Sequence, residues 1–266
     1  MKKLLALVLA LILVFSFSAC SSGSDAKTIK VGASPAPHAE ILEVAKGILA
    51  EKGYTLDIVE FTDYVLPNEA LNSGDIDANF FQHQPYLTNY NANNGTKLVS
   101  AGLIHYEPLG FYPGKLQTLD QITDGTTIAI PNDGSNEARA LYLLQDLGYI
   151  TVDGSKGFEV TVLDIKDNPK NLVISEVAAE QIPQLLPDFD FGIINGNYAI
   201  GAGIDDQILV AEDKESDAAV TYANLIAVKE GHEKDEKIVA LVEAVQSEEV
   251  RAFIEENYGV AVVPMF

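Results

Sequence analysis

The hydrophobic positions of this chain alternate between short continuous runs and stretches with helical spacing. Short apolar runs predict buried strands, whereas apolar residues three and four apart predict helices that pack on one side. In the first half the predicted order is strand 28–33, helix 35–53, strand 54–61, helix 67–74, strand 77–81, helix 85–94 and an extended run 97–112. Because strands and helices alternate, we expect a parallel sheet covered by helices.

The same alternation restarts in the second half of the chain. The predicted elements are strand 127–131, helix 135–148, strand 158–165, a helical piece at 183–186, strand 191–195, an apolar run 222–228 and a long amphipathic helix within 235–258. We predict two α/β lobes, the first from 28–108 with 224–266 and the second from 109–223. The chain then crosses twice between the lobes, and a ligand cleft is expected between them at the carboxyl ends of the strands.

The N-terminus carries a targeting signal. Two lysines precede an apolar run over 4–17 that is too short to cross a bilayer, and small residues follow it, so 1–19 is predicted to be a signal peptide. Cys20, the only cysteine, resembles the lipidated cysteine of a bacterial lipobox. We therefore expect a lipidated cysteine and a flexible tether over 20–27. The alternative is an ordinary secreted protein with a stray cysteine.

The charge of the chain excludes one class of partner. The formal net charge is −22, and it becomes −24 once the two lysines of the signal peptide are removed (−22 − 2). Such an acidic protein repels phosphate backbones, which argues against nucleic acid as a partner. Apolar residues make up 47% of the chain, enough for a sizeable core, and the single cysteine allows no disulfide within the chain.

The sequence lacks the common motifs of enzymes and nucleotide-binding proteins. It contains no G-x-S-x-G, no H-E-x-x-H, no Walker loop and no G-x-G-x-x-G. No metal-ligand spacing relates its histidines, which are His38, His83, His105 and His232. We therefore predict a protein that is not an enzyme and that binds neither a cofactor nor a metal ion, with a hydrolase as the least favoured function.

Polar and aromatic residues gather at the ends of the predicted strands. They are Tyr64 after the second strand, Phe81, His83 and Tyr86 after the third, Asn136 and Arg139 after the fourth, and Asn195 after a later one. Because neighbouring parallel strands end at the same edge of a sheet, these residues are candidates for a ligand site. The alternative is that the aromatic residues pack between layers and the asparagines shape turns.

Arg139 has two interpretations. It lies in the first turns of a predicted helix, where the helix dipole disfavours a cation. It either pairs with a nearby acid, such as Glu137 or Asp133, or binds the carboxylate of a ligand through its planar guanidinium, assisted by the amides of the helix N-terminus.

Several segments of the chain resemble one known family. They are FTDYVLPNEAL, DIDANFFQHQPYL, EPLGFY, IAIPNDGSNEARALYLLQ, NPKNL, IINGNYA and YANLIAVKE. Together they resemble the methionine-binding lipoproteins of bacterial ABC importers, the NlpA-type family. The resemblance implies a two-lobed, periplasmic-binding-protein-like fold of type 2 that closes on L-methionine and delivers it to an ABC permease and ATPase complex. It also implies lipid anchorage on the extracytoplasmic face, in a periplasm or on the outer face of the plasma membrane.

The resemblance also assigns roles to the candidate residues. It implies that Tyr64, Phe81, His83 and Tyr86 surround the thioether side chain, that Arg139 binds the carboxylate with Asn136 beside it, and that Asn195 and Asn224 orient the ammonium and carboxylate groups. The segment 217–221 departs from the Ser-Pro-Tyr that is usual there. A short methionine-containing peptide or another apolar amino acid on the same scaffold is therefore an alternative ligand, and D-methionine stays open. The acidic charge and the lipid tether also fit a surface lipoprotein with an adhesin or sensor role.

Overall fold

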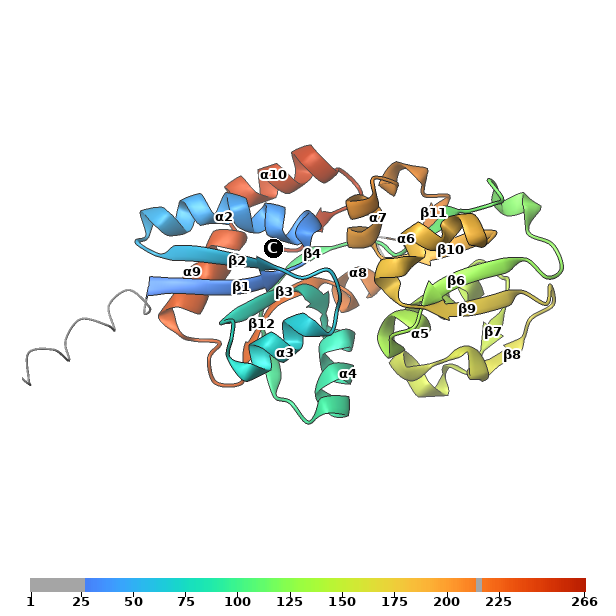
Figure 1. The fold of residues 1–266 in the computed structure, drawn as a ribbon, viewed down its shortest axis with the longest axis horizontal. Helices are drawn as coiled ribbons and strands as arrows, with labels where there is room; N and C mark the ends of the chain where they lie inside the picture. The colour runs from blue at the N-terminus through green and yellow to red at the C-terminus, as the bar shows by residue number, and fades with distance from the viewer. Residues whose placement is uncertain (1–26, 214–216) are drawn as a thin grey trace, which may run out of the picture.

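The computed structural model describes residues 27–213 and 217–266. The predicted signal peptide, Cys20 and the predicted tether up to residue 26 lie outside the described residues. Among the helices of the described ranges, none is both long and apolar enough to cross a membrane. Two separate sheets form the centres of two lobes that lie side by side (Figure 1).

The first lobe is built on a six-stranded sheet. Its order is β13-β4-β12-β3-β1-β2, with β1 (Thr28–Ala33), β2 (Thr55–Glu60), β3 (Ala78–His83), β4 (Leu98–Tyr106), β12 (Asn224–Lys229) and β13 (Val263–Pro264). The strands β1, β2 and β3 are parallel as predicted, but β12 runs antiparallel to both β3 and β4, and β13 runs antiparallel to β4. The sheet is therefore mixed, because the chain returns from the second lobe and inserts β12 in the reverse direction.

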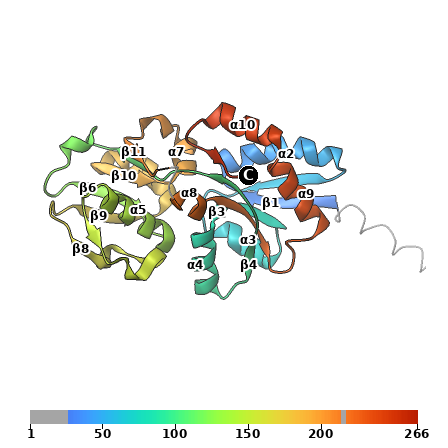
Figure 2. The ribbon, with the colours of Figure 1, turned by 180° about the vertical axis from the view of Figure 1, so that it is seen from behind.

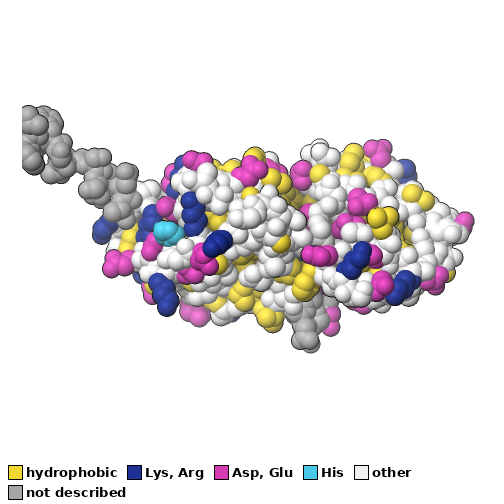
Figure 3. Space-filling model, turned by 90° about the horizontal axis from the view of Figure 1, so that it is seen from below, with side chains coloured by type: hydrophobic (Ala, Val, Ile, Leu, Met, Phe, Trp, Pro, Cys, Tyr) yellow, Lys and Arg dark blue, Asp and Glu magenta, His cyan; other side chains and the backbone are white. Residues whose placement is uncertain are grey.

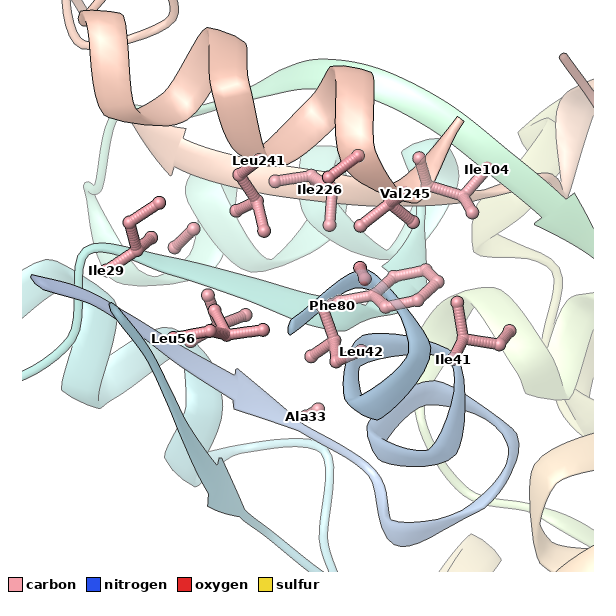
Figure 4. Packing of buried hydrophobic residues seen from close by; sticks show 14 of the residues in the cluster. Ile29, Ala33, Ile41, Leu42, Leu56, Phe80, Ile104, Ile226, Leu241 and Val245 are labelled. Carbon is pink, nitrogen blue, oxygen red and sulfur yellow. The ribbon is translucent and has the colours of Figure 1, made fainter. Parts of the chain in front are cut away.

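Helices cover both faces of this sheet (Figure 1). One face carries α2 (Glu40–Glu51), α9 (Glu236–Val245) and α10 (Glu248–Tyr258), and the other carries α3 (Leu66–Ser73) and α4 (Gln84–Asn94). Aliphatic side chains of β1, α2 and α9 pack around Phe80 between the first face and its helices (Figure 4). Each fully buried large apolar side chain contributes roughly 1.5–3 kcal/mol, so this core holds the lobe together.

The long helix predicted within 235–258 is two helices in the structure. The helix α9 ends at Val245, and α10 begins after Ser247. The hydroxyl oxygen of Ser247 accepts a hydrogen bond from the backbone N–H of Val250 at 3.3 Å. This N-cap satisfies a donor that the start of a helix would otherwise leave unpaired, so the chain begins a second helix there.

The second lobe is built on a five-stranded sheet of order β11-β5-β10-β6-β9. The strands are β5 (Gly110–Pro113), β6 (Thr127–Pro131), β9 (Val173–Val177), β10 (Phe191–Ile194) and β11 (Val210–Ala211), and β7 (Thr151–Val152) pairs separately with β8 (Ile165–Asp167). The α-helices are α5 (Gly134–Asp146), α6 (Ile182–Leu185) and α7 (Gly196–Ala202). Single turns of 3-10 helix are η3 (Leu119–Gln121), η4 (Gly154–Glu159), η5 (Val162–Asp164), η6 (Ala179–Gln181), η7 (Leu186–Asp188) and η8 (Asp205–Gln207).

Two of the predicted strands differ from the structure. The predicted strand 158–165 is mostly turns, η4 and η5, followed by β8. The carboxylate of Asp164 accepts from the backbone N–H of Thr161 at 2.9 Å as part of a capping box, which favours a helical turn over an extended chain. The predicted run 97–112 is divided between β4 of one sheet and β5 of the other. Pro108, which cannot donate a sheet hydrogen bond, lies at the break.

The chain crosses between the two sheets twice. The first crossing joins β4 to β5, and the second joins β11 to β12 through α8 (Asp217–Thr221), which lies between the sheets in both views (Figure 2). The expected lobe boundaries, 28–108 with 224–266 and 109–223, stay a prediction. Acidic and basic side chains lie over the outer surface of both lobes (Figure 3). The surfaces that face each other across the crossings hold the candidate site.

Candidate functional site

A cavity of about 20 Å³ lies between the two lobes. It is lined by Tyr64, Phe81, Gln82, His83, Tyr86, Glu107, Asn136, Arg139, Asn195, Gly196, Asn197 and Asn224. Every residue that the sequence predicts for the ligand site is among them, so the fold brings these distant positions to one place. The remaining lining residues are Gln82, Glu107, Gly196 and Asn197. Of these, only Asn197 is marked by the sequence pattern, as a polar residue at the end of a predicted strand, and it is not assigned a role in the ligand site.

One end of the cavity is aromatic. Tyr64 follows β2, Phe81 belongs to β3 and Tyr86 lies in the first turn of α4, so all three come from the first lobe. Their ring centroids are 5.7 to 5.8 Å apart, and the hydroxyl of Tyr86 donates to the carbonyl oxygen of Tyr64 at 2.7 Å. Burial raises the pKa of Tyr86 far above its ordinary value, so its phenol stays neutral. Such rings favour an apolar or sulfur-containing group.

Asn136 organises the polar end of the cavity. Its amide nitrogen donates to both carboxylate oxygens of Asp133 at 3.0 Å. Its amide oxygen accepts from Nδ2 of Asn195 at 3.0 Å and lies 3.1 Å from Nε2 of His83. Both ends of the amide are therefore engaged with the protein, and Asn136 holds its neighbours in place.

His83 is a neutral hydrogen-bond donor. Burial, and after it the positive charge of Arg139, lower the pKa of His83 to about 3. The backbone N–H of Tyr86 donates to Nδ1 at 3.2 Å, so the ring proton lies on Nε2 and is donated to Asn136. Since His83 ends β3 and Asn136 lies in α5, this hydrogen bond joins the two lobes.

Two buried side chains at the polar end of the cavity carry acceptor oxygens. Asn195 is buried, and no donor to its Oδ1 is found within the described part of the chain. Glu107 is 5% exposed, and burial raises the pKa of its carboxyl. A buried acceptor without a donor costs about 1–3 kcal/mol, so a ligand with several N–H donors would relieve this cost. An ammonium group has that chemistry.

Arg139 is already paired inside the protein. Its Nε donates to Oε1 of Glu212 at 2.8 Å, and its Nη2 donates to Oε2 of Glu212 at 2.5 Å and to the carbonyl oxygen of Glu107 at 2.9 Å. The guanidinium carbon lies 4.2 Å from the ring centroid of Tyr222. Burial disfavours the ionised form of Glu212, but Arg139 outweighs it and lowers the pKa of that carboxyl. A ligand anion would meet an arginine whose charge is shared with Glu212.

The nearby acids are not the partners of Arg139. Asp133 caps α5 by accepting from the backbone N–H of Asn136 at 3.0 Å. Glu137 accepts from the backbone N–H of Val162 at 2.8 Å. Both carboxylates accept hydrogen bonds from backbone N–H groups. The arginine pairs instead with Glu212, which lies 73 residues further along the chain. Of the two interpretations, the one in which Arg139 pairs with an acid describes its contacts in the structure, but Glu137 and Asp133 are the wrong partners.

Further contacts hold the lobes together beside the cavity. The hydroxyl of Tyr64 donates to Oδ1 of Asn197 at 2.5 Å, and the hydroxyl of Tyr198 donates to the carbonyl oxygen of Thr62 at 3.3 Å. In each pair one residue follows β2 and the other lies in α7 of the second lobe. The cavity is thus enclosed by contacts that an outward rotation of the lobes would break.

Gly196 allows the closest approach between α7 and the first crossing. A Cβ atom placed on Gly196 would lie 2.8 Å from both Cβ and Oε2 of Glu107. Only a residue without a side chain fits here, so the start of α7 can lie directly against the carboxylate.

Comparisons with known proteins place this architecture in a family. Residues 29–266 match the NlpA lipoprotein family. The chain belongs to that family. It is 40% identical over 276 residues to the methionine-binding lipoprotein MetQ of Bacillus subtilis, covering 100% of this chain and 99% of that protein. The two-lobed fold is that of a binding protein.

Solved structures agree with this assignment to the NlpA lipoprotein family. The nutrient-binding protein of Burkholderia cenocepacia bound to methionine has a TM-score of 0.85 at 42% identity, covering 90% of this chain and 100% of that one. A periplasmic substrate-binding protein of an ABC transporter from Coxiella burnetii has a TM-score of 0.83 at 39% identity, covering 89% and 100%.

One cluster of buried side chains in this NlpA lipoprotein was not predicted from the sequence. Ligand-type atoms of His38, His105 and Glu107 lie within 4.8 Å of one another, although His38 is distant from the other two in the sequence. Nε2 of His105 lies 2.6 Å from Oε1 of Glu107, a hydrogen-bond distance and shorter than the about 3.3 Å between neighbouring ligands of a tetrahedral metal ion. We therefore interpret the cluster as a hydrogen-bond network. The sequence holds one signal for it: His105 and Glu107 are two residues apart in the predicted extended run 97–112, a spacing that places both side chains on one face of an extended chain.

Proposed function

We propose that this NlpA lipoprotein binds methionine between its lobes, outside the cytoplasm, and delivers it to the permease of an ABC importer. The observation that carries the proposal is the division of the enclosed cavity into an aromatic end and a polar end that holds a buried acceptor without a donor. The names of the similar proteins from B. subtilis, B. cenocepacia and C. burnetii support it.

The polar end suits the charged groups of a free amino acid. Oδ1 of Asn195 and the carboxylate of Glu107 accept hydrogen bonds from the ammonium group. Arg139 and the amide of Asn224 donate to the carboxylate. Hydrogen bonds to charged groups are worth about 1.5–3 kcal/mol each, so these contacts supply most of the affinity.

The aromatic end suits the thioether side chain. Tyr64, Phe81 and Tyr86 line the cavity with their rings in contact, and in this proposal they surround the sulfur and methyl groups of the ligand. Each sulfur–aromatic contact contributes about 0.3–1.5 kcal/mol. The rings therefore select the shape of the side chain, while the polar end selects an amino acid.

The size of the cavity favours a single amino acid over a peptide. Its volume of about 20 Å³ is far below the roughly 300–1,000 Å³ of ligand sites, so the lobes must part or the lining side chains must move for even a single amino acid to enter. A dipeptide would add a residue and would require the contact between Tyr64 and Asn197 to open. We therefore favour free methionine over a methionine-containing dipeptide.

Delivery follows from the position of the ligand between the lobes. Contacts to Tyr64 and Phe81 on one side and to Asn195 and Arg139 on the other stabilise the closed form, so closure reports that the protein is loaded. A permease that recognises the closed form receives only loaded protein. Lipidation at Cys20 would keep this NlpA lipoprotein at the membrane surface, on the extracytoplasmic face.

Calorimetric titration with L-methionine tests the proposal. The protein is first unfolded and refolded to remove any co-purified ligand. We expect one-to-one binding, and competition with D-methionine, leucine and a methionine-containing dipeptide ranks the alternatives. No heat of binding in protein shown to be free of ligand would refute the proposal.

A matched pair of variants locates the site. Asn195→Ala removes the buried acceptor and is expected to weaken binding by about tenfold or more, in line with the loss of a hydrogen bond to a charged group. Asn93→Ala changes an exposed asparagine of α4 and is expected to bind as the wild type does. Equal affinities of both variants would exclude Asn195 from the site.

A further inference from the structure

Behind the polar end of the cavity lies a second layer of buried side chains. His38 belongs to the turn η2 (Pro35–Ala39) and is 1% exposed, and His105 belongs to β4 and is 0% exposed. The edge of Phe80 packs against both rings, with centroid distances of 4.6 and 5.2 Å. Neither histidine lines the cavity, but each contacts a residue that does.

The hydrogen bonds of the two rings have a defined direction. Nε2 of His105 lies 2.6 Å from Oε1 of Glu107. Nε2 of His38 lies 3.0 Å from Oδ1 of Asn224 and 3.5 Å from Oε1 of Glu107. The amide oxygen of Asn224 only accepts, so His38 carries its proton on Nε2, and a Glu107 carboxylate that receives the ammonium group of a ligand likewise accepts from Nε2 of His105.

The remaining ring nitrogens agree with this protonation. Nδ1 of His38 and Nδ1 of His105 have no hydrogen-bond partner within the described ranges, as expected of unprotonated nitrogens in a buried layer. Burial lowers the pKa of His38 to about 4 and the pKa of His105 to about 3, so both rings are neutral near pH 7.

We propose that His38 and His105 are positioning residues, which fix the amide of Asn224 and the carboxylate of Glu107 in the orientations that a bound amino acid requires. His38 occupies Oδ1 of Asn224, which leaves the amide nitrogen, a donor, for the carboxylate of the ligand. His105 holds one oxygen of Glu107, which directs the carboxylate toward the ammonium group. The inference rests on the proposed function.

Paired substitutions separate a positioning role from a structural one. His105→Leu and His38→Leu remove the donor at similar size, whereas His105→Gln and His38→Gln keep an amide donor near the position of Nε2. The ligands are L-methionine, 4-(methylsulfanyl)butanoate, which lacks the ammonium group, and 3-(methylsulfanyl)propylamine, which lacks the carboxylate. Thermal unfolding of each variant establishes that it is folded.

The expected pattern differs between the two histidines. His105→Leu weakens L-methionine binding by about tenfold, as for a lost contact to a charged group, but leaves the butanoate within about twofold. His38→Leu weakens L-methionine binding to a similar degree but leaves the propylamine nearly unchanged. The glutamine variants recover most of the affinity.

Several results would overturn the inference. Equal losses for all three ligands would mean that the histidines serve only the fold, and unchanged affinities would mean that they position nothing. Long-range ¹H–¹⁵N NMR of the wild type tests the direction of the bonds without a ligand, and a proton on Nδ1 of either ring would contradict it. If the wild type itself fails to bind L-methionine, the proposed function fails and the ligand roles fail with it, whereas a loss confined to the variants leaves that function intact.

Discussion

The two ends of the cavity are built in different ways. The aromatic end comes from one lobe and from a short stretch of chain, 64–86, and its rings hold one another by packing. The polar end joins residues of both lobes and of the first crossing through hydrogen bonds between positions far apart in the sequence. Packing adapts to small changes, whereas a buried polar group that loses its partner stays unpaired. The largest effects of mutation are therefore expected at the polar end.

The first way to test this contrast is to remove the cation of the polar end. Arg139→Met leaves the largely buried carboxylate of Glu212 without its cation, with the Tyr106 hydroxyl and the Leu109 N–H as its remaining donors among the described residues, which costs up to about 3–5 kcal/mol of unfolding free energy. L-methionine binding is expected to be lost as well. Urea unfolding and calorimetric titration measure the two effects separately.

The double variant Arg139→Met with Glu212→Leu is the control. It removes both charges, so we expect it to recover most of the stability, because a pair of apolar side chains replaces a buried ion pair at little cost. Binding should stay lost. A single variant as stable as the wild type would show that Glu212 reaches water and that the polar end is less tightly coupled than its geometry indicates.

The second test fills the tight contact between Gly196 of α7 and Glu107 of the first crossing. Gly196→Ala places a methyl group 2.8 Å from Glu107, and overpacking of this kind costs about 1–3 kcal/mol. We expect weaker L-methionine binding and a larger radius of gyration by small-angle X-ray scattering, because the lobes cannot close fully. Gly201→Ala in the same helix meets nothing within 4 Å and should change neither quantity.

The third test reaches the aromatic end without changing its rings. Tyr64→Phe removes only the hydroxyl that donates to Asn197, at a cost of about 0.5–1.5 kcal/mol in the closed form. The affinity should fall by a few-fold, mostly through faster dissociation in stopped-flow measurements. Tyr198→Phe removes a longer hydrogen bond, of 3.3 Å to Thr62, and should have a smaller effect. The reverse order would mean that Tyr64 does not hold the lobes closed.

The same contrast explains how far the sequence alone could predict the site. Tyr64, Phe81 and Tyr86 could be predicted as site residues from the sequence. Each lies at or soon after the end of a predicted strand, and the ends of neighbouring strands meet at one edge of a sheet. The partner of Arg139 could not be predicted from the sequence, since Glu212 lies 73 residues away on the second crossing. The contact of His38 with Asn224 spans 186 residues and depends on the insertion of β12 between β3 and β4.

The fold shows a similar division between local and distant causes. The alternation of strands and helices in both lobes follows from hydrophobic periodicity, which acts over a few residues. The antiparallel direction of β12 depends on the return of the chain from the other lobe, which periodicity cannot show. The prediction of a strand at 158–165 was wrong because the capping box of Thr161 and Asp164 stabilises a helical turn there, and this outweighs the preference of the apolar alternation for a strand.

The last and smallest expected effect is a pH dependence of stability that comes from Glu137. This residue lies close to Arg139 in the sequence, but its carboxylate accepts a hydrogen bond from Val162 within the second lobe. Burial, and with it the nearby charge of Glu176, raises the pKa of Glu137 from 4.5 to about 7, although its bond to the Val162 N–H opposes the shift. The folded state therefore binds this proton more tightly than the unfolded chain, so the group stabilises the fold below pH 4.5 and this contribution is lost as the pH rises through about 7.

Glu137→Gln cannot ionise and keeps an oxygen that can accept from Val162, so the variant should lack this decline in unfolding free energy. Its stability relative to the wild type is expected to increase between pH 4.5 and about 7 in urea unfolding series. L-methionine affinity should stay unchanged, because Glu137 does not line the cavity. A variant that loses affinity would place Glu137 in the network of the polar end and would extend that network into the core of the second lobe.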